Sequence, residues 1–225
     1  MKKNITIVGA GLAGSLCALY LTKRGHKVSI FERRNDLRSE IITAGKSINL
    51  ALSTRGLTAL KKVGVDADIM QIAIPMDKRI MHDDKGRLTE QLYGNDGQAI
   101  YSVSRAQLNV LMMKLAAKNG ANLYFNEKCV EANLEEASVV FENTNTHRKQ
   151  TVTSDLIIGA DGAFSAVRKQ MVEQYDHDYN YNKIDHDYKE LHIPAGKNGT
   201  FLLDKNALHI WPRGDFMLIA LANLD

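Results

Sequence analysis

The feature that most restricts the fold is a glycine pattern, G-x-G-x-x-G, at residues 9–14. It directly follows a short apolar run, Ile5 to Val8, whose β-branched side chains predict a strand buried on both faces of a parallel sheet. Beyond the glycines, apolar side chains recur at helical spacing from Leu12 to Tyr20, and Val28 to Phe31 predicts a second strand. Strand, helix and strand within about thirty residues predict a βαβ unit.

Each part of this unit has a role in dinucleotide binding. Gly9 allows the tight turn, Gly11 lets the backbone approach a pyrophosphate, and Gly14 lets helix and strand pack closely. The helix N-terminus offers N–H groups and a partial positive charge to the phosphates. Glu32, eighteen residues beyond the last glycine, ends the second strand and can accept hydrogen bonds from ribose hydroxyls. The pattern therefore predicts a bound dinucleotide, and it serves FAD and NAD alike.

A second signal lies late in the chain. Asp155 to Gly159 predicts another buried strand, which runs into Asp161 and Gly162. Taken alone, Asp161 would be expected only to cap a helix that begins near Ala163. Together with the first motif, it becomes a candidate cofactor residue.

The rest of the chain alternates between helical and extended patterns. Helical spacing is found from Ser53 to Ile72 and from Arg105 to Lys118, and Ser104 is a good N-cap for the second of these. Residues 208–221 alternate around a Pro-Arg-Gly-Asp turn and predict an antiparallel hairpin. Residues 173–188 are expected to cross between domains. Shorter extended pieces are expected at residues 78–82, 87–93, 122–126, 130–134 and 139–142.

Composition excludes several classes of protein. With 44% hydrophobic and 24% charged residues, the chain is typical of a soluble globular protein. The net charge of +3 comes from scattered residues, so nucleic acid is not an expected partner. Cys17 and Cys129 are far apart, which predicts a reducing compartment, and neither they nor His177, His186 and His192 have the spacing of a metal site. We expect a cytoplasmic protein without a metal, and the glycines in the first apolar run argue against a signal peptide or membrane segment.

Two motifs together resemble those of the FAD-dependent single-component aromatic hydroxylases. They are the glycine pattern at residues 9–14 and the run Gly-Ala-Asp-Gly-Ala-Phe-Ser-Ala-Val-Arg at residues 159–168. Within that family, residues 45–56, 101–105 and 208–212 are similar to the members that hydroxylate L-kynurenine. The likeness extends from Ile5 to Asp225.

The resemblance implies an α/β fold in which a Rossmann-type FAD-binding domain is interleaved with an antiparallel or mixed β-sheet substrate domain. We assign residues 1–73 and 98–175 to the first domain and residues 74–97 and 176–225 to the second. The implied reaction is the hydroxylation of L-kynurenine to 3-hydroxykynurenine in tryptophan degradation, with bound FAD, with NADPH as co-substrate and with O2. The flavin carries this chemistry, so no catalytic side chain is assigned.

The resemblance also implies the site residues. Arg79 and Tyr93 would bind the carboxylate of kynurenine, and Leu208, Met217 and Ile219 would wall its aromatic ring. From the residues alone, a carboxylate suits the fork of an arginine, but a surface arginine at a strand end and three ordinary core residues stay open as interpretations. The implied cofactor residues are Gly9, Gly11, Leu12, Ala13, Gly14, Glu32, Arg33, Arg34, Ala51, Arg105 and Asp161.

Members of this family continue beyond the hairpin with a Gly-Asp motif and a helical region, and the sequence ends before them. We therefore expect an N-terminal portion, completed by a C-terminal half or by a homodimer partner. Alone, it is expected to bind FAD weakly or not at all, to be inactive, and to associate or aggregate instead of remaining a monomer. Two alternatives stay open: a related flavoprotein hydroxylase of another aromatic acid, and an inactive dinucleotide-binding fragment.

Overall fold

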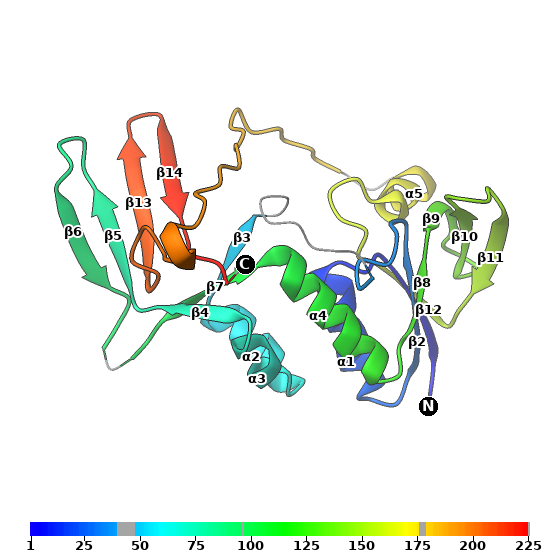
Figure 1. Ribbon diagram of the computed structural model, residues 1–225. Helices are drawn as coiled ribbons and strands as arrows, with labels where there is room; N and C mark the ends of the chain where they lie inside the picture. The colour runs from blue at the N-terminus through cyan, green and yellow to red at the C-terminus, as the bar shows by residue number, and fades with distance from the viewer. Residues whose placement is uncertain (40–47, 96, 176–178, 225) are drawn as a thin grey trace. The chain divides into compact units, whose positions relative to one another are not determined.

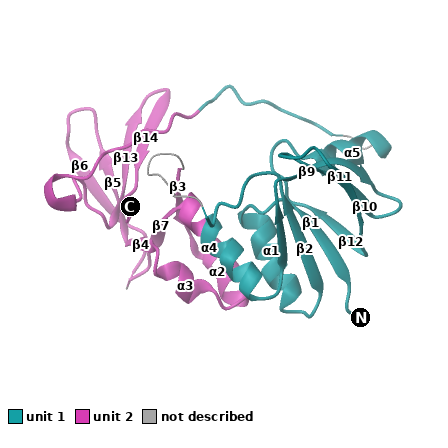
Figure 2. Ribbon diagram, turned by 45° about the vertical axis from the view of Figure 1, so that its right-hand side comes forward, with its two compact units in different colours: residues 1–41, 109–187 teal, residues 42–108, 188–225 magenta. Residues whose placement is uncertain are grey.

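The computed structural model describes residues 1–39, 48–95, 97–175 and 179–224. Some positions singled out above lie outside these residues, namely 45–47 of the stretch at 45–56, His177 and Asp225. The chain divides into two compact units, residues 1–41 with 109–187 and residues 42–108 with 188–225 (Figure 2). Compactness assigns no function to either unit, so the boundaries of a cofactor domain and a substrate domain stay a prediction.

A four-stranded parallel sheet belongs to the first unit (Figure 1). Its strands are β1 (Asn4–Val8), β2 (Lys27–Glu32), β8 (Asn122–Phe125) and β12 (Leu156–Gly159), in the order β12-β1-β2-β8. Every pairing in it is parallel. Helix α1 (Leu12–Thr22) connects β1 to β2, so the predicted βαβ unit is confirmed.

The strand predicted from Asp155 to Gly159 forms as β12, but it is not buried as expected. Leu156 exposes 43% of its surface. The physical reason is its place in the sheet: β12 is the last strand on one side of the described sheet, so only β1 lies beside it. An apolar run in the sequence does not distinguish this edge position from a central one.

An antiparallel sheet packs on the parallel sheet within the same unit. Its strands are β9 (Glu127–Asn133), β10 (Ser138–Asn143) and β11 (Lys149–Thr153). The ring of Phe141 on β10 stacks on that of Phe31 on β2, with 4.1 Å between centroids. One buried cluster joins the two sheets to helix α5 (Ala166–Gln174): Val8, Phe31, Cys129, Ala132, Val139, Phe141 and Val167.

The helical predictions have three outcomes. Helix α4 (Arg105–Lys118) has the predicted bounds, and the boundary between the two units falls within it. The pattern from Ser53 to Ile72 instead forms two helices, α2 (Thr54–Lys62) and α3 (Asp66–Met70), because Gly64 between them has φ +63° and ends the first. The start near Ala163 is also wrong, since α5 begins after Ser165, whose Oγ accepts a hydrogen bond from the Arg168 N–H at 3.0 Å.

The second unit contains two sheets. One has the order β14-β13-β5-β6 and consists of β5 (Lys78–His82), β6 (Leu88–Leu92), β13 (Ala207–Arg213) and β14 (Phe216–Ala220). The predicted hairpin is confirmed as β13 and β14, and because β13 pairs with β5 in parallel, this sheet is mixed. The other sheet has the order β3-β7-β4 and consists of β3 (Asn49–Leu52), β4 (Ala73–Met76) and β7 (Ile100–Ser104).

The described part of the segment between α5 and β13 contains little regular structure. The predicted crossing segment forms neither helix nor strand from residue 179 to residue 188, whereas its first residues belong to α5. A single short 3-10 helix, η1 (Lys197–Gly199), follows before β13. Among the residues that the structure describes, no helix is both long enough and apolar enough to cross a membrane.

Candidate functional site

The glycine-rich turn between β1 and α1 is the first part of the candidate cofactor site. Gly9 has φ +103°, and its N–H donates to the Phe31 carbonyl at 2.8 Å. A Cβ on Gly9 would lie 2.5 Å from the Ala160 carbonyl oxygen, and a Cβ on Gly14 would lie 2.0 Å from the Gly9 carbonyl oxygen. Neither position can hold a larger residue unless the backbone moves.

Gly11 differs from these two glycines. It is the N-cap of α1, and a Cβ on it would meet nothing within 4 Å. Leu12 and Ala13 form the first turn of the helix, and no side chain of the described residues caps this end. The helix therefore has free N–H groups and the positive end of its dipole available for a phosphate.

Glu32 connects the turn to the end of β2 and is only 6% exposed. Its Oε2 accepts a hydrogen bond from the Ala10 N–H at 2.9 Å, while Oε1 accepts from the Arg34 N–H at 3.1 Å and from Arg34 Nε at 2.8 Å. Burial raises the pKa of Glu32, but these bonds, led by that from the Arg34 side chain, outweigh burial and lower it. The carboxylate is thus ionised at neutral pH, and since it offers about four acceptor positions, it can accept a further hydroxyl donor.

Asp161 has partners within its own loop. Its Oδ1 accepts a hydrogen bond from Ser165 Oγ at 2.6 Å, and its Oδ2 accepts from the Ala166 N–H at 2.7 Å. The side chain therefore caps the N-terminus of α5, which is the role that the local pattern alone suggests. Contact between Asp161 and a cofactor stays a prediction.

The remaining predicted cofactor residues are exposed. Arg33 and Arg34 follow Glu32 at the end of β2, and the Arg34 side chain is 52% exposed. Ala51 lies on β3 opposite Ser102 of β7, and Arg105 is the first residue of α4. These last two belong to the second unit, and their contacts with the flavin half of a cofactor stay predictions.

The register of the mixed sheet β14-β13-β5-β6 places the predicted substrate residues on one face. Arg79 on β5 pairs with Leu208 on β13, and Ile210, two residues further along β13, pairs with Ile219 on β14. Met217 pairs with the next alternate residue of β13. Paired residues, and residues two apart on one strand, point to the same side of a sheet. We call this side the Arg79 face, and its residues are Arg79, Met81, Gln91, Tyr93, Leu208, Ile210, Met217 and Ile219.

Tyr93 belongs to the Arg79 face because it lies two residues beyond Gln91, which pairs with Arg79. The Tyr93 N–H donates to the Asp77 carbonyl at 2.9 Å, which extends the pairing of β5 with β6. Burial raises the pKa of Tyr93, and the charge of Arg79 opposes that rise, so the two side chains are close enough to interact. The hydroxyl of Tyr93 is therefore protonated at neutral pH and able to donate a hydrogen bond.

The Arg79 guanidinium has a neutral partner. Nε donates to Gln91 Oε1 at 2.8 Å, and Nη2 donates to the same oxygen. In the part of the chain that the structure describes, no carboxylate pairs with Arg79. Gln91 cannot be found from the sequence alone, because only the register of β5 against β6 brings it to Arg79.

The opposite face of the same sheet is buried on its two central strands, where Ile80 and His209 are each 4% exposed. The edge strands are exposed on both faces: Leu92 and Phe216 on the opposite face are 66% and 68% exposed, and Met217 and Ile219 on the Arg79 face are 63% and 51% exposed. Lys78, which directly precedes Arg79, places its Nζ 3.3 Å from the Glu90 carboxylate and 3.0 Å from the Asp204 carboxylate. Adjacent residues of one strand therefore differ: the lysine has two carboxylate partners, and the arginine has a neutral amide.

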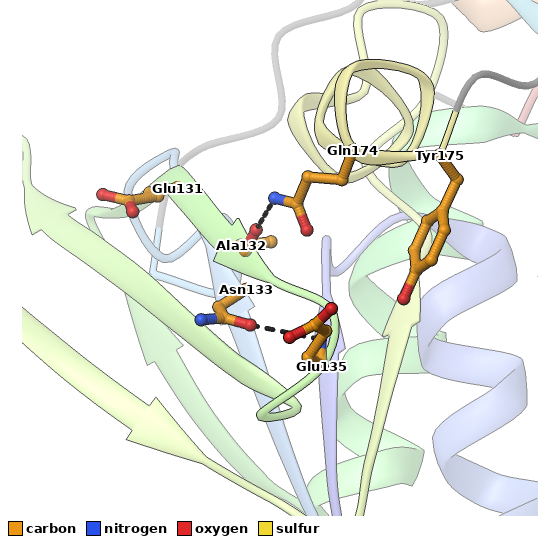
Figure 3. Close-up of a pocket in the computed structure, with 6 residues that line it drawn as sticks. All are labelled: Glu131, Ala132, Asn133, Glu135, Gln174 and Tyr175. Carbon is orange, nitrogen blue, oxygen red and sulfur yellow. Dashed lines mark hydrogen bonds between the residues drawn. The ribbon is translucent and has the colours of Figure 1, made fainter.

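The first unit also contains a groove of about 330 Å³ between β9 and α5 (Figure 3). The Gln174 amide crosses it, with Nε2 donating to the Ala132 carbonyl at 2.8 Å. No predicted site residue lines this groove, whose walls are Glu131, Ala132, Asn133, Glu135, Gln174 and Tyr175. We do not assign a function to it.

Comparison with known proteins identifies the family. A family model described as an FAD binding domain matches residues 2–201. The chain belongs to this FAD-binding family. The geometry fits the cofactor, since the tight turn at Gly9 and Gly14, the unobstructed Gly11 and the ionised Glu32 suit a pyrophosphate and a ribose. The family membership decides between the two dinucleotides in favour of FAD.

Two similar curated proteins, from Christiangramia forsetii and Anopheles gambiae, are each named kynurenine 3-monooxygenase. That of Christiangramia forsetii is 46% identical over 224 residues, which are 100% of this chain and 50% of the relative. That of Anopheles gambiae is 45% identical over 224 residues, 99% of this chain and 46% of the relative. The chain thus spans about half the length of the curated relatives it matches.

Solved structures confirm the fold. The flavin-dependent monooxygenase PieE, in complex with FAD and substrate, has a TM-score of 0.63 at 21% identity, covering 76% of this chain and 32% of that chain. The tetrameric form of 2-methyl-3-hydroxypyridine-5-carboxylic acid oxygenase has a TM-score of 0.62 at 22% identity, covering 76% and 42%. The likeness at this identity shows the flavin monooxygenase fold alone.

Proposed function

We propose that the protein hydroxylates L-kynurenine to 3-hydroxykynurenine, with FAD as bound cofactor, NADPH as electron donor and O2 as oxidant. The observation that carries the proposal is the Arg79 face. It presents a cation without a carboxylate partner among the described residues, a neighbouring phenol and a set of apolar side chains. L-kynurenine has the matching chemistry, a carboxylate on a short tail and an aromatic ring. The identity with the kynurenine 3-monooxygenases supports the same substrate.

The proposed roles follow from the side-chain chemistry. Arg79 binds the substrate carboxylate through its remaining N–H donors, and Tyr93 donates its hydroxyl hydrogen to the same group. Leu208, Met217 and Ile219 pack on the aromatic ring and exclude water from it. Together these contacts fix the position of the ring carbon that is hydroxylated, which is the contribution that orientation makes to such a reaction.

The proposal also gives each predicted cofactor residue a role. Gly9, Gly11, Leu12, Ala13 and Gly14 receive the pyrophosphate and Glu32 the ribose, while Arg33 and Arg34 contact the adenosine half. Ala51 is proposed to lie near the flavin and Arg105 on its ribityl and phosphate side, while Asp161 belongs to a motif proposed to contact both FAD and NADPH. When bound, FAD supplies the electron transfer and the oxygen activation, for which the amino-acid side chains have no equivalent.

The experiment is an assay of the complete protein, that is, this chain together with the C-terminal half or second copy that we propose it acts with. It is purified, and 3-hydroxykynurenine formation and NADPH oxidation are followed with FAD and O2 present. We expect absorbance near 450 nm from bound flavin and NADPH oxidation that L-kynurenine stimulates. Stimulation by another aromatic acid instead of L-kynurenine would support the related hydroxylase. Absence of both flavin absorbance and turnover would support the inactive dinucleotide-binding fragment.

Two further parts of the proposal concern the cellular location of the protein and its assembly. We propose a cytoplasmic location, which the two free cysteines support because reducing conditions keep thiols unpaired; fractionation of cells tests it. We also propose that the chain acts together with a C-terminal half or a second copy of itself. Size-exclusion chromatography with light scattering measures the mass of the assembly.

A further inference from the structure

Gln91 fixes the orientation of the Arg79 guanidinium. Gln91 and Arg79 are paired across β6 and β5, and both lie on the Arg79 face. The single oxygen Oε1 of Gln91 accepts hydrogen bonds from Arg79 Nε at 2.8 Å and from Nη2. One amide oxygen thus holds one whole edge of the guanidinium.

A guanidinium is planar and has two edges on which two parallel N–H groups can meet a carboxylate. The side edge consists of Nε and Nη2, and the end edge consists of Nη1 and Nη2. Gln91 occupies the side edge of Arg79, so the end edge is left for a ligand. The described residues provide no partner for Nη1.

The neutrality of the Gln91 amide matters as much as its geometry. A glutamate at the same place would accept the same two hydrogen bonds and would also neutralise the guanidinium. The adjacent cation shows that arrangement, since Lys78 is paired with the carboxylates of Glu90 and Asp204 on the opposite face. Gln91 orients Arg79 and leaves its positive charge uncompensated.

We infer that Gln91 is a positioning residue: it holds Arg79 by the side edge so that the end edge, fully charged, binds the carboxylate of the substrate. This inference rests on the proposed function, because it gives Arg79 the role of carboxylate anchor. In this role Gln91 acts on the substrate through Arg79 and not on the reacting atoms. Its effect should therefore appear in the apparent KM for carboxylate-bearing substrates and not in kcat.

Two substitutions at one position separate this role from a structural one. Gln91→Glu keeps the shape and both hydrogen-bond acceptors but adds a negative charge beside Arg79. Gln91→Met keeps the length and removes the acceptor. If Gln91 only braced β6 against β5, the glutamate variant would behave as wild type and the methionine variant would be the worse of the two.

We expect the opposite order. Gln91→Glu should raise the apparent KM for L-kynurenine by about tenfold or more, because the carboxylate of the ligand meets a neutralised guanidinium, and Gln91→Met should raise it by about threefold. Both should leave kcat within about twofold. Binding of kynuramine, the analogue that lacks the carboxylate and keeps the ammonium group, should not be weakened in either variant. Glu90 directly precedes Gln91 and lies on the opposite face, so Glu90→Gln is the matched control and should leave the KM unchanged.

The outcomes are distinguishable. A wild-type protein that neither binds nor hydroxylates L-kynurenine overturns the proposed function and this inference with it. A wild type that does so, together with a Gln91→Glu variant whose KM stays within twofold of it, overturns only the role of Gln91. Unfolding curves of each variant, measured alongside, show whether a change in KM accompanies a loss of folded protein.

Discussion

In the glycine-rich turn of the first unit, contacts within the chain hold the groups that a cofactor meets. Glu32 accepts three hydrogen bonds there, and Gly9 and Gly14 each lie against a backbone carbonyl. On the Arg79 face of the second unit, the side chains predicted to meet the substrate are half-buried or exposed, and Arg79 has only a neutral partner. The fold alone determines the first site, whereas the second needs a ligand to pair its charge and cover its apolar residues.

This difference predicts how substitutions act. At Gly9 and Gly14 of the turn, a change of residue alters the packing of strand and helix before it alters any ligand contact, so stability and cofactor affinity fall together. On the Arg79 face, truncating a half-exposed side chain removes few contacts within the protein, so ligand affinity falls while stability changes little.

The largest expected effect is that of Gly14→Ala. The added Cβ would lie 2.0 Å from the Gly9 carbonyl oxygen, so α1 and the turn must move apart. We expect a loss of about 3 kcal/mol or more in the free energy of unfolding, measured by urea denaturation, and loss of bound flavin with it.

Gly11→Ala is the matched control for that substitution. Its Cβ would meet nothing within 4 Å, so stability should change by less than about 1 kcal/mol. If a pyrophosphate approaches this backbone, the same variant should nevertheless bind FAD more weakly. Wild-type stability for the alanine at position 14, or wild-type FAD affinity for the alanine at position 11, would contradict the assignment of these glycines.

The second effect concerns Glu32→Ala. We expect FAD affinity to fall by about 1 to 3 kcal/mol, the range for losing a hydrogen bond to a charged group. Fluorescence titration of the apoprotein with FAD measures it. Glu32→Gln, which keeps one acceptor oxygen and removes the charge, should give an intermediate loss. Retention of flavin through dialysis by the alanine variant would exclude the ribose role.

The two sites also differ in how far the sequence predicts them. The turn could be predicted because all its determinants are close in the chain: a strand, three glycines within six residues and a carboxylate at the end of the next strand. Gly9 and Gly14 have the close contacts that the pattern requires. Local sequence is sufficient where local backbone geometry makes the site.

The Arg79 face could be predicted only through the resemblance to a family. Its geometry depends on pairing Arg79 with Leu208, more than a hundred residues apart, and no spacing in one sequence encodes that register. For the same reason Gln91 was missed, and the edge position of β12 was not foreseen. The break at Gly64 was visible as a glycine, and its left-handed conformation ends α2 locally: the Val65 N–H donates to the Leu60 carbonyl at 3.3 Å and the Gly64 N–H to the Lys61 carbonyl at 2.9 Å.

The third effect is on the Arg79 face itself. Arg79→Ala should raise the apparent KM for L-kynurenine by about tenfold or more, because a charged hydrogen bond contributes about 1.5 to 3 kcal/mol. Steady-state NADPH oxidation at varied kynurenine measures it. Lys78→Ala, one residue earlier and on the opposite face, should leave this KM unchanged. A wild-type kynurenine dependence in the Arg79 variant would show that the carboxylate binds elsewhere.

Tyr93→Phe should have a smaller effect on the same measurement. It removes one neutral donor and keeps the ring, so we expect an increase in KM of about twofold to tenfold, corresponding to about 0.5 to 1.5 kcal/mol. The raised pKa of Tyr93 keeps the hydroxyl protonated at pH 8, so this contribution should not decline between pH 7 and pH 8. An equal loss for Tyr93→Phe and Arg79→Ala would mean that the phenol, not the cation, is the main anchor.

The smallest expected effect is a pH dependence of stability that arises on the face of the β14-β13-β5-β6 sheet opposite Arg79. On the face opposite Arg79, His209 Nε2 lies 3.0 Å from the Asp204 carbonyl, which can only accept, so Nε2 carries the hydrogen. Nδ1 of His209 therefore accepts the hydrogen bond from His82 Nε2, at 2.9 Å. Burial, and then the charges of His209 and Arg213, lower the pKa of His82. The folded protein thus resists the protonation of His82.

The sign of the pH effect follows from that shift. Below about pH 6.5, the ordinary histidine pKa, the unfolded chain binds the proton more readily than the folded one, so the stability present above this pH is lost as the pH falls towards the lowered pKa of the folded state. Urea unfolding at pH 7.5, 6.5 and 5.5 measures the loss. His82→Gln keeps a donor for His209 without titrating, and its stability should depend less on pH than that of wild type. Equal slopes for both proteins would exclude His82 as the source of the pH dependence. A parallel change in substrate affinity at Arg79 would show that the two faces of the sheet are coupled.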